Sequence, residues 1–211
     1  MKDNLKWLIL LPVLVAVVVL AIFIPRLVSS GSSSASTVDQ NNQLVQQQID
    51  QDKTTITNYQ DLTRKNPNDQ LALKSLGDTY TDLGDQQSAA GKSNDAAYSY
   101  KFAVDQYRQY LKLNSKDTEV RIDLGYAYTQ LNMGDVARRE FQTAIAQQPN
   151  NQRAWLNVGY LELQTGKVDE SKDPLNKAIS LNPNSQYGQD AKQLLDQANN
   201  GGNQNLVPVT P

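Results

Sequence analysis

The stretch WLNVGYLELQTGKVDESKDPLNKAISLNP, residues 155–183, contains a Gly, an Ala and a Pro that also occur earlier in the chain at one fixed distance. Three pairs lie 34 residues apart: Gly125 and Gly159, Ala144 and Ala178, and Pro149 and Pro183. In each unit, one apolar-periodic segment carries the Gly and a second carries the Ala. The second segment ends at the Pro, which stops a helix. The spacing therefore predicts a repeated pair of helices.

This pattern resembles the tetratricopeptide repeat, a two-helix unit of the same period. The last unit matches the family motif at Trp155, Val158, Gly159, Ser171, Leu175, Ala178 and Pro183, and departs from it at Glu162, where Tyr is expected. The middle unit matches at Leu124, Gly125, Tyr128, Ala137, Phe141, Ala144 and Pro149, with Arg121 in place of the Trp. The resemblance implies an all-α solenoid of about three helix-turn-helix repeats with capping helices.

An earlier unit has the same motif with an insertion. Gly77 and Ala103 are 26 residues apart, whereas Gly125 and Ala137 are 12 apart, so fourteen residues are added. Fourteen residues are close to four helical turns, and about seven in each helix would keep both faces in phase. This spacing predicts a long hairpin with its turn near residues 91–94. A surface loop at residues 85–95 is the alternative.

The repeats divide the rest of the chain. We expect a tetratricopeptide domain over residues 38–199 and a disordered tail over residues 200–211. Within the domain we expect a preceding helix at 38–66, the repeat with the long hairpin at 70–117, repeats at 118–151 and 152–183, and a capping helix at 184–199. The Ser-rich residues 29–37 are predicted to be a flexible linker.

The N-terminal residues 1–28 are predicted to be a transmembrane anchor. Residues 7–25 are uncharged and almost wholly apolar, and a helix of that length spans a bilayer. Lys2 and Lys6 precede this segment, and Arg26 alone follows it closely. The positive-inside rule then places the N-terminus in the cytoplasm and the repeat domain on the other side of a single-pass membrane protein. A cleaved signal peptide is the alternative.

Composition excludes several classes of function. The chain has no Cys and no His, which removes disulfides, thiolate nucleophiles, Ser-His-Asp triads and metal sites with Cys or His ligands. We therefore expect no enzyme, no cofactor and no metal. Without its N-terminal segment the chain has a net charge of −4, so we expect no nucleic-acid partner.

A second face of the repeat helices predicts a groove for a protein or peptide partner. Residues on the face opposite the expected core recur at the 34-residue offset and combine apolar and aromatic side chains with an acidic border. The candidates are Lys74, Asp78, Glu119, Ile122, Asp123, Tyr126, Arg153, Leu156, Asn157, Tyr160 and Leu163. The acidic border consists of Asp78, Asp82, Glu119 and Asp123 and favours a basic or neutral segment. Alternatively, Tyr126 and Tyr160 pack against the neighbouring repeat or the C-terminal helix.

Some members of the family clamp a terminal carboxylate with Lys, Asn and Arg on this face. Lys74 and Arg153 match two of those positions, but Asp78 and Asp123 stand where Asn is needed and would repel a carboxylate. Asn157 stands where a basic residue is needed. The sequence therefore argues against this function.

The resemblance favours a membrane-anchored scaffold similar to single-pass bacterial envelope proteins that assist secretion, assembly or folding. Two alternatives stay open. One is a self-associating structural protein, a homodimer formed through a helical stripe of Val45, Ile49, Ile56 and Tyr59. The other is a receptor with the same fold facing the cytosol.

Overall fold

The computed structural model describes residues 34–200. The predicted membrane anchor at residues 1–28 and nearly all of the predicted tail lie outside the described residues. Residues 34–37, which were expected to belong to the linker, are helical instead; the rest of that linker is not described. No helix within residues 34–199 is both long and apolar enough to cross a membrane. The chain divides into two units, Met1–Val38 and Asp39–Pro211, and apart from the start of the first helix the description below concerns the second.

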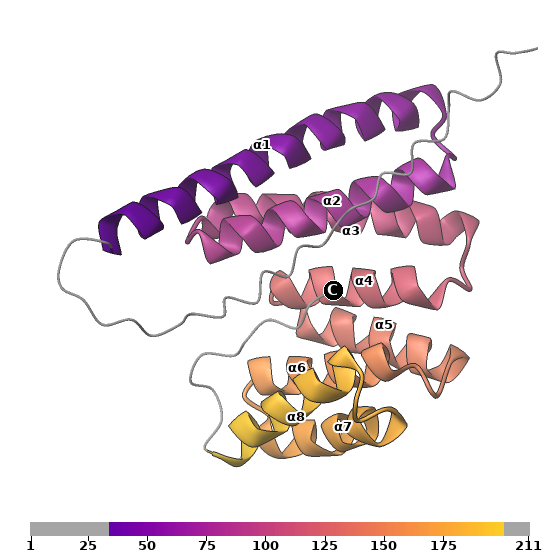
Figure 1. The fold of residues 1–211 in the computed structure, drawn as a ribbon. Helices are drawn as coiled ribbons and strands as arrows, with labels where there is room; N and C mark the ends of the chain where they lie inside the picture. The colour runs from indigo at the N-terminus through magenta and orange to yellow at the C-terminus, as the bar shows by residue number, and fades with distance from the viewer. Residues whose placement is uncertain (1–33, 201–211) are drawn as a thin grey trace, which may run out of the picture. The chain divides into compact units, whose positions relative to one another are not determined.

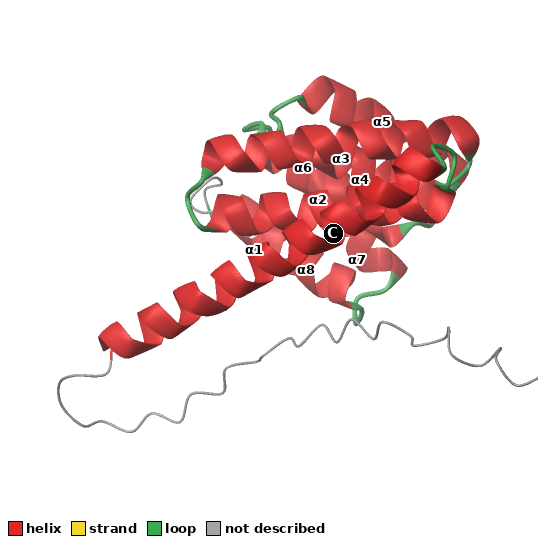
Figure 2. Cartoon of the chain, turned by 90° about the horizontal axis from the view of Figure 1, so that it is seen from above, coloured by secondary structure: helices red, strands yellow, loops and turns green. Residues whose placement is uncertain are grey.

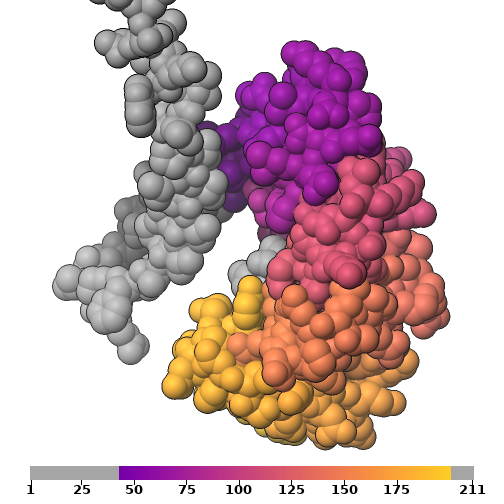
Figure 3. All heavy atoms as spheres, turned by 90° about the vertical axis from the view of Figure 1, so that its right-hand side faces the viewer, coloured from indigo at the N-terminus to yellow at the C-terminus, as the bar shows by residue number. Residues whose placement is uncertain are grey.

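The described part of the chain forms eight helices and contains no strand (Figures 1 and 2). In order they are α1 (Ser34–Lys65), α2 (Gln70–Ala89), α3 (Ser93–Leu113), α4 (Thr118–Gln130), α5 (Gly134–Gln147), α6 (Gln152–Gln164), α7 (Val168–Leu181) and α8 (Gln186–Asn199). The pairs α2–α3, α4–α5 and α6–α7 form three successive hairpins, and each hairpin packs against the next. Figure 3 shows the colours in chain order, from the violet of α1 and α2 through the orange of α5 and α6 to the yellow of α7 and α8.

The first helix of each unit begins at a side chain that caps it. The capping side chain accepts a hydrogen bond from the backbone N–H three residues later, which satisfies a donor that has no partner in the helix. The caps of α2, α4, α6 and α8 are Asp69, Asp117, Asn151 and Ser185. The last three lie 34 residues apart, so the repeat also sets where each unit begins.

The hairpin of α2 and α3 is longer than the other two. Its helices have 20 and 21 residues, compared with 13 and 14 in α4 and α5, so each is longer by seven. Residues 85–89 are helical, and the turn lies between Ala89 and Ser93 with Gly91 at a φ of 72°. The structure therefore has the long hairpin and not the surface loop at residues 85–95.

The recurring Gly lets the two helices of a hairpin approach closely. A Cβ on Gly125 would lie 2.5 Å from Cε1 of Phe141, and one on Gly159 would lie 2.5 Å from Leu175. Phe141 and Leu175 have no exposed surface. The 34-residue spacing of the Gly thus reflects one repeated contact between a first helix and the ring or branched side chain of its partner.

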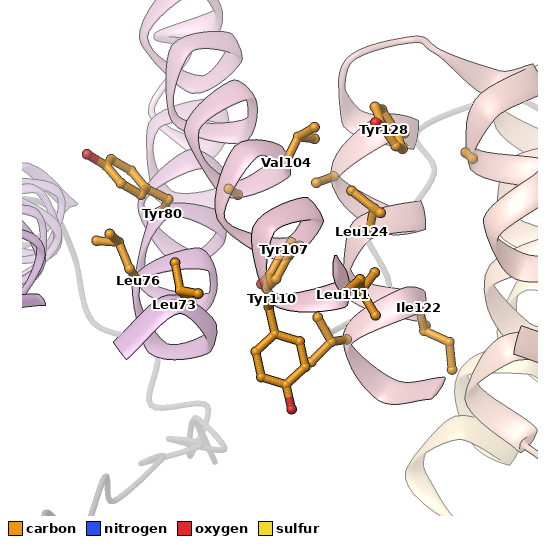
Figure 4. Packing of buried hydrophobic residues seen from close by; sticks show 14 of the residues in the cluster. Leu73, Leu76, Tyr80, Val104, Tyr107, Tyr110, Leu111, Ile122, Leu124 and Tyr128 are labelled. Carbon is orange, nitrogen blue, oxygen red and sulfur yellow. The ribbon is translucent and has the colours of Figure 1, made fainter. Parts of the chain in front are cut away.

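The core extends across all the hairpins. One cluster of buried side chains runs from α1 to α6, and Figure 4 shows the part contributed by α2, α3 and α4, including Leu73, Tyr107 and Leu124. A second cluster joins Tyr126 of α4 to α6, α7 and α8, and Ala191 and Leu194 of α8 are buried in it as expected for a capping helix.

Helix α1 packs against this core through few side chains. Ile49 and Ile56 are 3% and 7% exposed and belong to the first cluster. Gln60 donates a hydrogen bond of 2.7 Å to the hydroxyl of Tyr80, whereas residues 43–48 are exposed. The two Ile side chains of the stripe considered for a dimer are therefore used within the chain.

Candidate binding cleft

The first helices of the three hairpins bring charged side chains to one cleft. It has a volume of about 260 Å³ and lies across α2, α4 and α6, with α3 contributing one ring. Its lining residues, here called the acidic cleft, are Lys74, Asp78, Thr81, Asp82, Tyr107, Glu119, Asp123 and Arg153. Six of these were predicted from the sequence: Lys74, Asp78, Asp82, Glu119, Asp123 and Arg153. Four carboxylates and two cations give the cleft an excess of negative charge.

The α2 side of the cleft is arranged around Asp78. Its Oδ2 accepts a hydrogen bond of 2.7 Å from Nζ of Lys74, one turn earlier on the same helix. Its Oδ1 accepts a hydrogen bond of 3.0 Å from the hydroxyl of Tyr107, which also lies 3.1 Å from Oγ1 of Thr81. Tyr107 is 1% exposed, so its ring fixes the position of this carboxylate.

The opposite side is formed by Arg153 of α6. Its guanidinium donates to Asp123 of α4 and, over 3.2 Å, to Oε2 of Glu119. Burial lowers the pKa of Arg153, but the charge and hydrogen bond of Asp123, together with the weaker effects of Tyr187 and Glu119, raise that pKa above its ordinary value, so the guanidinium stays protonated. Its Nε has no hydrogen-bond partner among the described residues although the atom is buried. Asn157 is buried and donates to the carbonyl of Arg153, which places it behind the cleft.

Asp82 is a cleft carboxylate whose ionisation is disfavoured. It keeps contact with water, and partial desolvation followed by repulsion from neighbouring carboxylates raises its pKa from 3.8 to about 6. The neighbours, in order of effect, are Asp52, Asp85, Asp78 and Asp123. A cation placed beside Asp82 would relieve this repulsion.

Two carboxylates next to the cleft were not among the predicted site residues. Asp85 accepts hydrogen bonds of 2.6 Å and 2.9 Å from the hydroxyls of Tyr100 and Tyr126. Asp52 of α1 is 7% exposed and accepts a hydrogen bond of 2.7 Å from the side-chain amide of Gln86. Burial raises the pKa of Asp52. The spacing of Asp78, Asp82 and Asp85 by four and three residues is the sequence signal for one acidic stripe along α2.

The apolar part of the predicted groove lies in the core. Exposed fractions are between 0% and 3% for Ile122, Tyr126, Leu156, Tyr160 and Leu163. These five side chains do not line an open groove, because α4 contacts the hairpins before and after it, and α6 contacts α4 and α8. Tyr126 and Tyr160 belong to the cluster that contains the buried residues of α8, which is the packing given as the alternative.

The chemistry of the cleft is that of charge and hydrogen bonding. Within residues 34–200, no group of carboxylates is arranged to hold a metal ion. The available functional groups are carboxylate acceptors, one ammonium and one guanidinium, which suit recognition of a polar ligand.

Comparison with known proteins gives the repeat a family name. Residues 122–186 match the family described as "Tetratricopeptide repeat". Over 121 residues the chain is 26% identical to "Anaphase-promoting complex subunit CDC16" of Saccharomyces cerevisiae, covering 56% of this chain and 13% of that protein. Over 85 residues it is 31% identical to "BBSome complex member BBS4" of Xenopus tropicalis, covering 40% of this chain and 16% of that protein. The chain thus spans less than a fifth of the length of either relative.

Two solved structures are similar to parts of this chain. The TPR2B domain of yeast Sti1, in a complex with Hsp70, has a TM-score of 0.47 at 18% identity over 56% of this chain and 96% of that one. MamA has a TM-score of 0.44 at 24% identity over 72% and 88%. The described residues form an all-α, tetratricopeptide-like helical solenoid.

Proposed function

We propose that this protein is a scaffold that binds a basic or neutral segment of a partner protein in the acidic cleft. The observation that carries the proposal is the convergence of Asp78, Asp82, Glu119 and Asp123 from two first helices onto one cleft. A Lys or Arg of the ligand beside Asp82 would lower the raised pKa of that carboxyl.

The proposal includes attachment to a membrane. Its support is the apolar run at residues 7–25 and the preceding Lys residues, which favour a cytoplasmic N-terminus and an extracytoplasmic repeat domain. The two curated relatives are named as members of protein assemblies, which fits a scaffold. A role in secretion, assembly or chaperoning at a bacterial cell envelope is our interpretation of the resemblance noted from the sequence.

The test is binding of a fluorescein-labelled peptide of Lys, Ala and Leu to the full-length chain, measured by anisotropy. Replacing Asp82→Asn together with Glu119→Gln should weaken binding about tenfold, because both changes remove charge that faces the ligand. The matched control replaces Asp135→Asn and Asp196→Asn, exposed acids on α5 and α8, and should leave the affinity unchanged. Equal affinities for the cleft variant and the wild type would contradict the proposal.

The cytosol-facing alternative is tested separately. Protease added outside intact cells should digest the repeat domain if it faces away from the cytoplasm, and should spare it if the topology is reversed. This outcome is independent of whether the cleft binds a peptide.

A further inference from the structure

The outer surface of α3 carries two exposed aromatic rings one helical turn apart. Tyr98 is 63% exposed and Phe102 is 48% exposed. Phe102 stacks on Tyr80 with ring centroids 5.1 Å apart and an angle of 19° between the planes. Exposed aromatic rings gathered in one place mark interaction sites more often than isolated apolar side chains do. These two residues define what we call the α3 aromatic face.

A hollow lies on each side of this face. The larger, about 510 Å³, lies between α1, α2 and α3 and is lined by Gln60, Thr63, Arg64, Pro67, Leu76, Tyr80, Phe102, Gln106 and Gln109. The smaller, about 310 Å³, is lined by Asn94, Ala97, Tyr98 and Lys101. Phe102 lines the first hollow and Tyr98 the second. Because the two residues are one helical turn apart on α3, one ligand can contact both rings. Neither hollow is part of the acidic cleft.

The charge of these hollows is opposite to that of the acidic cleft. Each has one cation, Arg64 or Lys101, and the described residues that line them include no Asp or Glu. Nζ of Lys101 lies 5.5 Å from the centroid of the Tyr98 ring. Arg64 pairs with Asp61 over 2.7 Å, but both side chains are at least half exposed. Such an ion pair contributes little and is readily exchanged for another.

We propose that the α3 aromatic face is a second docking surface, and that its occupant is an acidic amphipathic segment of a partner protein. An apolar side chain of that segment enters the larger hollow beside Phe102. Carboxylates on its flanks meet Arg64 and Lys101, and side-chain amides such as Gln106 bind its polar groups. The surface is distinct from the acidic cleft, so either proposal can fail without the other.

The experiment measures binding of two labelled probe peptides to the full-length chain. One probe is an amphipathic peptide of Leu, Phe, Asp and Glu, and the other has Lys at every acidic position. The acidic probe should bind about tenfold more weakly when Arg64→Glu and Lys101→Glu are combined, and about fivefold more weakly with Tyr98→Ser. The Lys probe should not displace it. Lys177→Glu, an exposed reversal on α7, is the matched control and should change nothing.

Three results would overturn the proposal. The first is an equal affinity of the acidic probe for the wild type and for the variant that combines Arg64→Glu and Lys101→Glu. The second is displacement of the acidic probe by the Lys probe, which would place both in one site. The third is self-association of the chain that the same two reversals abolish, since the occupant would then be a second copy. Because Tyr98 is 63% exposed, its replacement is not expected to prevent folding.

Discussion

At the scale of single residues, the Gly of each first helix marks a close approach between the two helices of its hairpin. Gly125→Ala would place a Cβ 2.5 Å from Phe141, whose ring is fully buried and cannot move aside. Such overpacking costs about 1–3 kcal/mol of unfolding free energy, measurable by urea denaturation. Gly134→Ala is the control, because its nearest neighbour is 3.3 Å away, a methyl of Thr165. An equal loss in both variants would show that helix packing at Gly125 is not the cause.

The raised pKa of Asp82 also predicts how the stability of the fold depends on pH. Between its ordinary value of 3.8 and about 6, the folded chain holds a proton that the unfolded chain has lost. The contribution of Asp82 to the free energy of unfolding is therefore fully present below pH 3.8 and is lost as the pH rises through 6. Asp82→Asn should reduce the loss between pH 4 and 7 by less than about 1 kcal/mol, since an exposed group is screened. Thermal unfolding at both pH values measures it, and Asp135→Asn is the comparison. An identical pH profile in Asp82→Asn and wild type would refute it.

At the scale of single helices, α1 is the most weakly attached part of the described chain. Because it meets the core mainly through Ile49 and Ile56, Ile56→Asp should raise hydrogen exchange of its amides and leave α6 protected. Leu62→Asp, at a position 45% exposed, is the control and should have little effect. Loss of protection in α6 equal to that in α1 would show that α1 unfolds only together with the whole stack.

Single helices also show what the sequence could and could not predict. The spacing of Gly, Ala and Pro predicted the hairpins, and a fourteen-residue insertion predicted that α2 and α3 are each longer by seven residues, because local periodicity sets helix length. The burial of Tyr126 could not be predicted this way, because the periodicity of α4 alone does not show which of its faces the neighbouring hairpins cover. Asp85 was missed because its partners Tyr100 and Tyr126 come from two other helices.

At the scale of the whole molecule, stacking separates two kinds of surface. The acidic cleft is assembled from first helices, so each hairpin contributes part of it and no single repeat is sufficient. The α3 aromatic face depends on the one long hairpin and on the neighbouring α1. We therefore expect ligands of opposite charge at these two surfaces.

The central claim is that the acidic cleft binds a partner, and photo-crosslinking in cells tests it most directly. The photo-crosslinking probes replace Asp82 and Glu119, which line the cleft, and a control probe replaces the exposed Lys192 of α8. Tyr126 and Tyr160 are unsuitable positions because both side chains are buried in the core. The account predicts that both cleft probes, and not the control, label the same protein at a segment containing Lys or Arg. Adducts only to the chain itself, or none above the control, would contradict it.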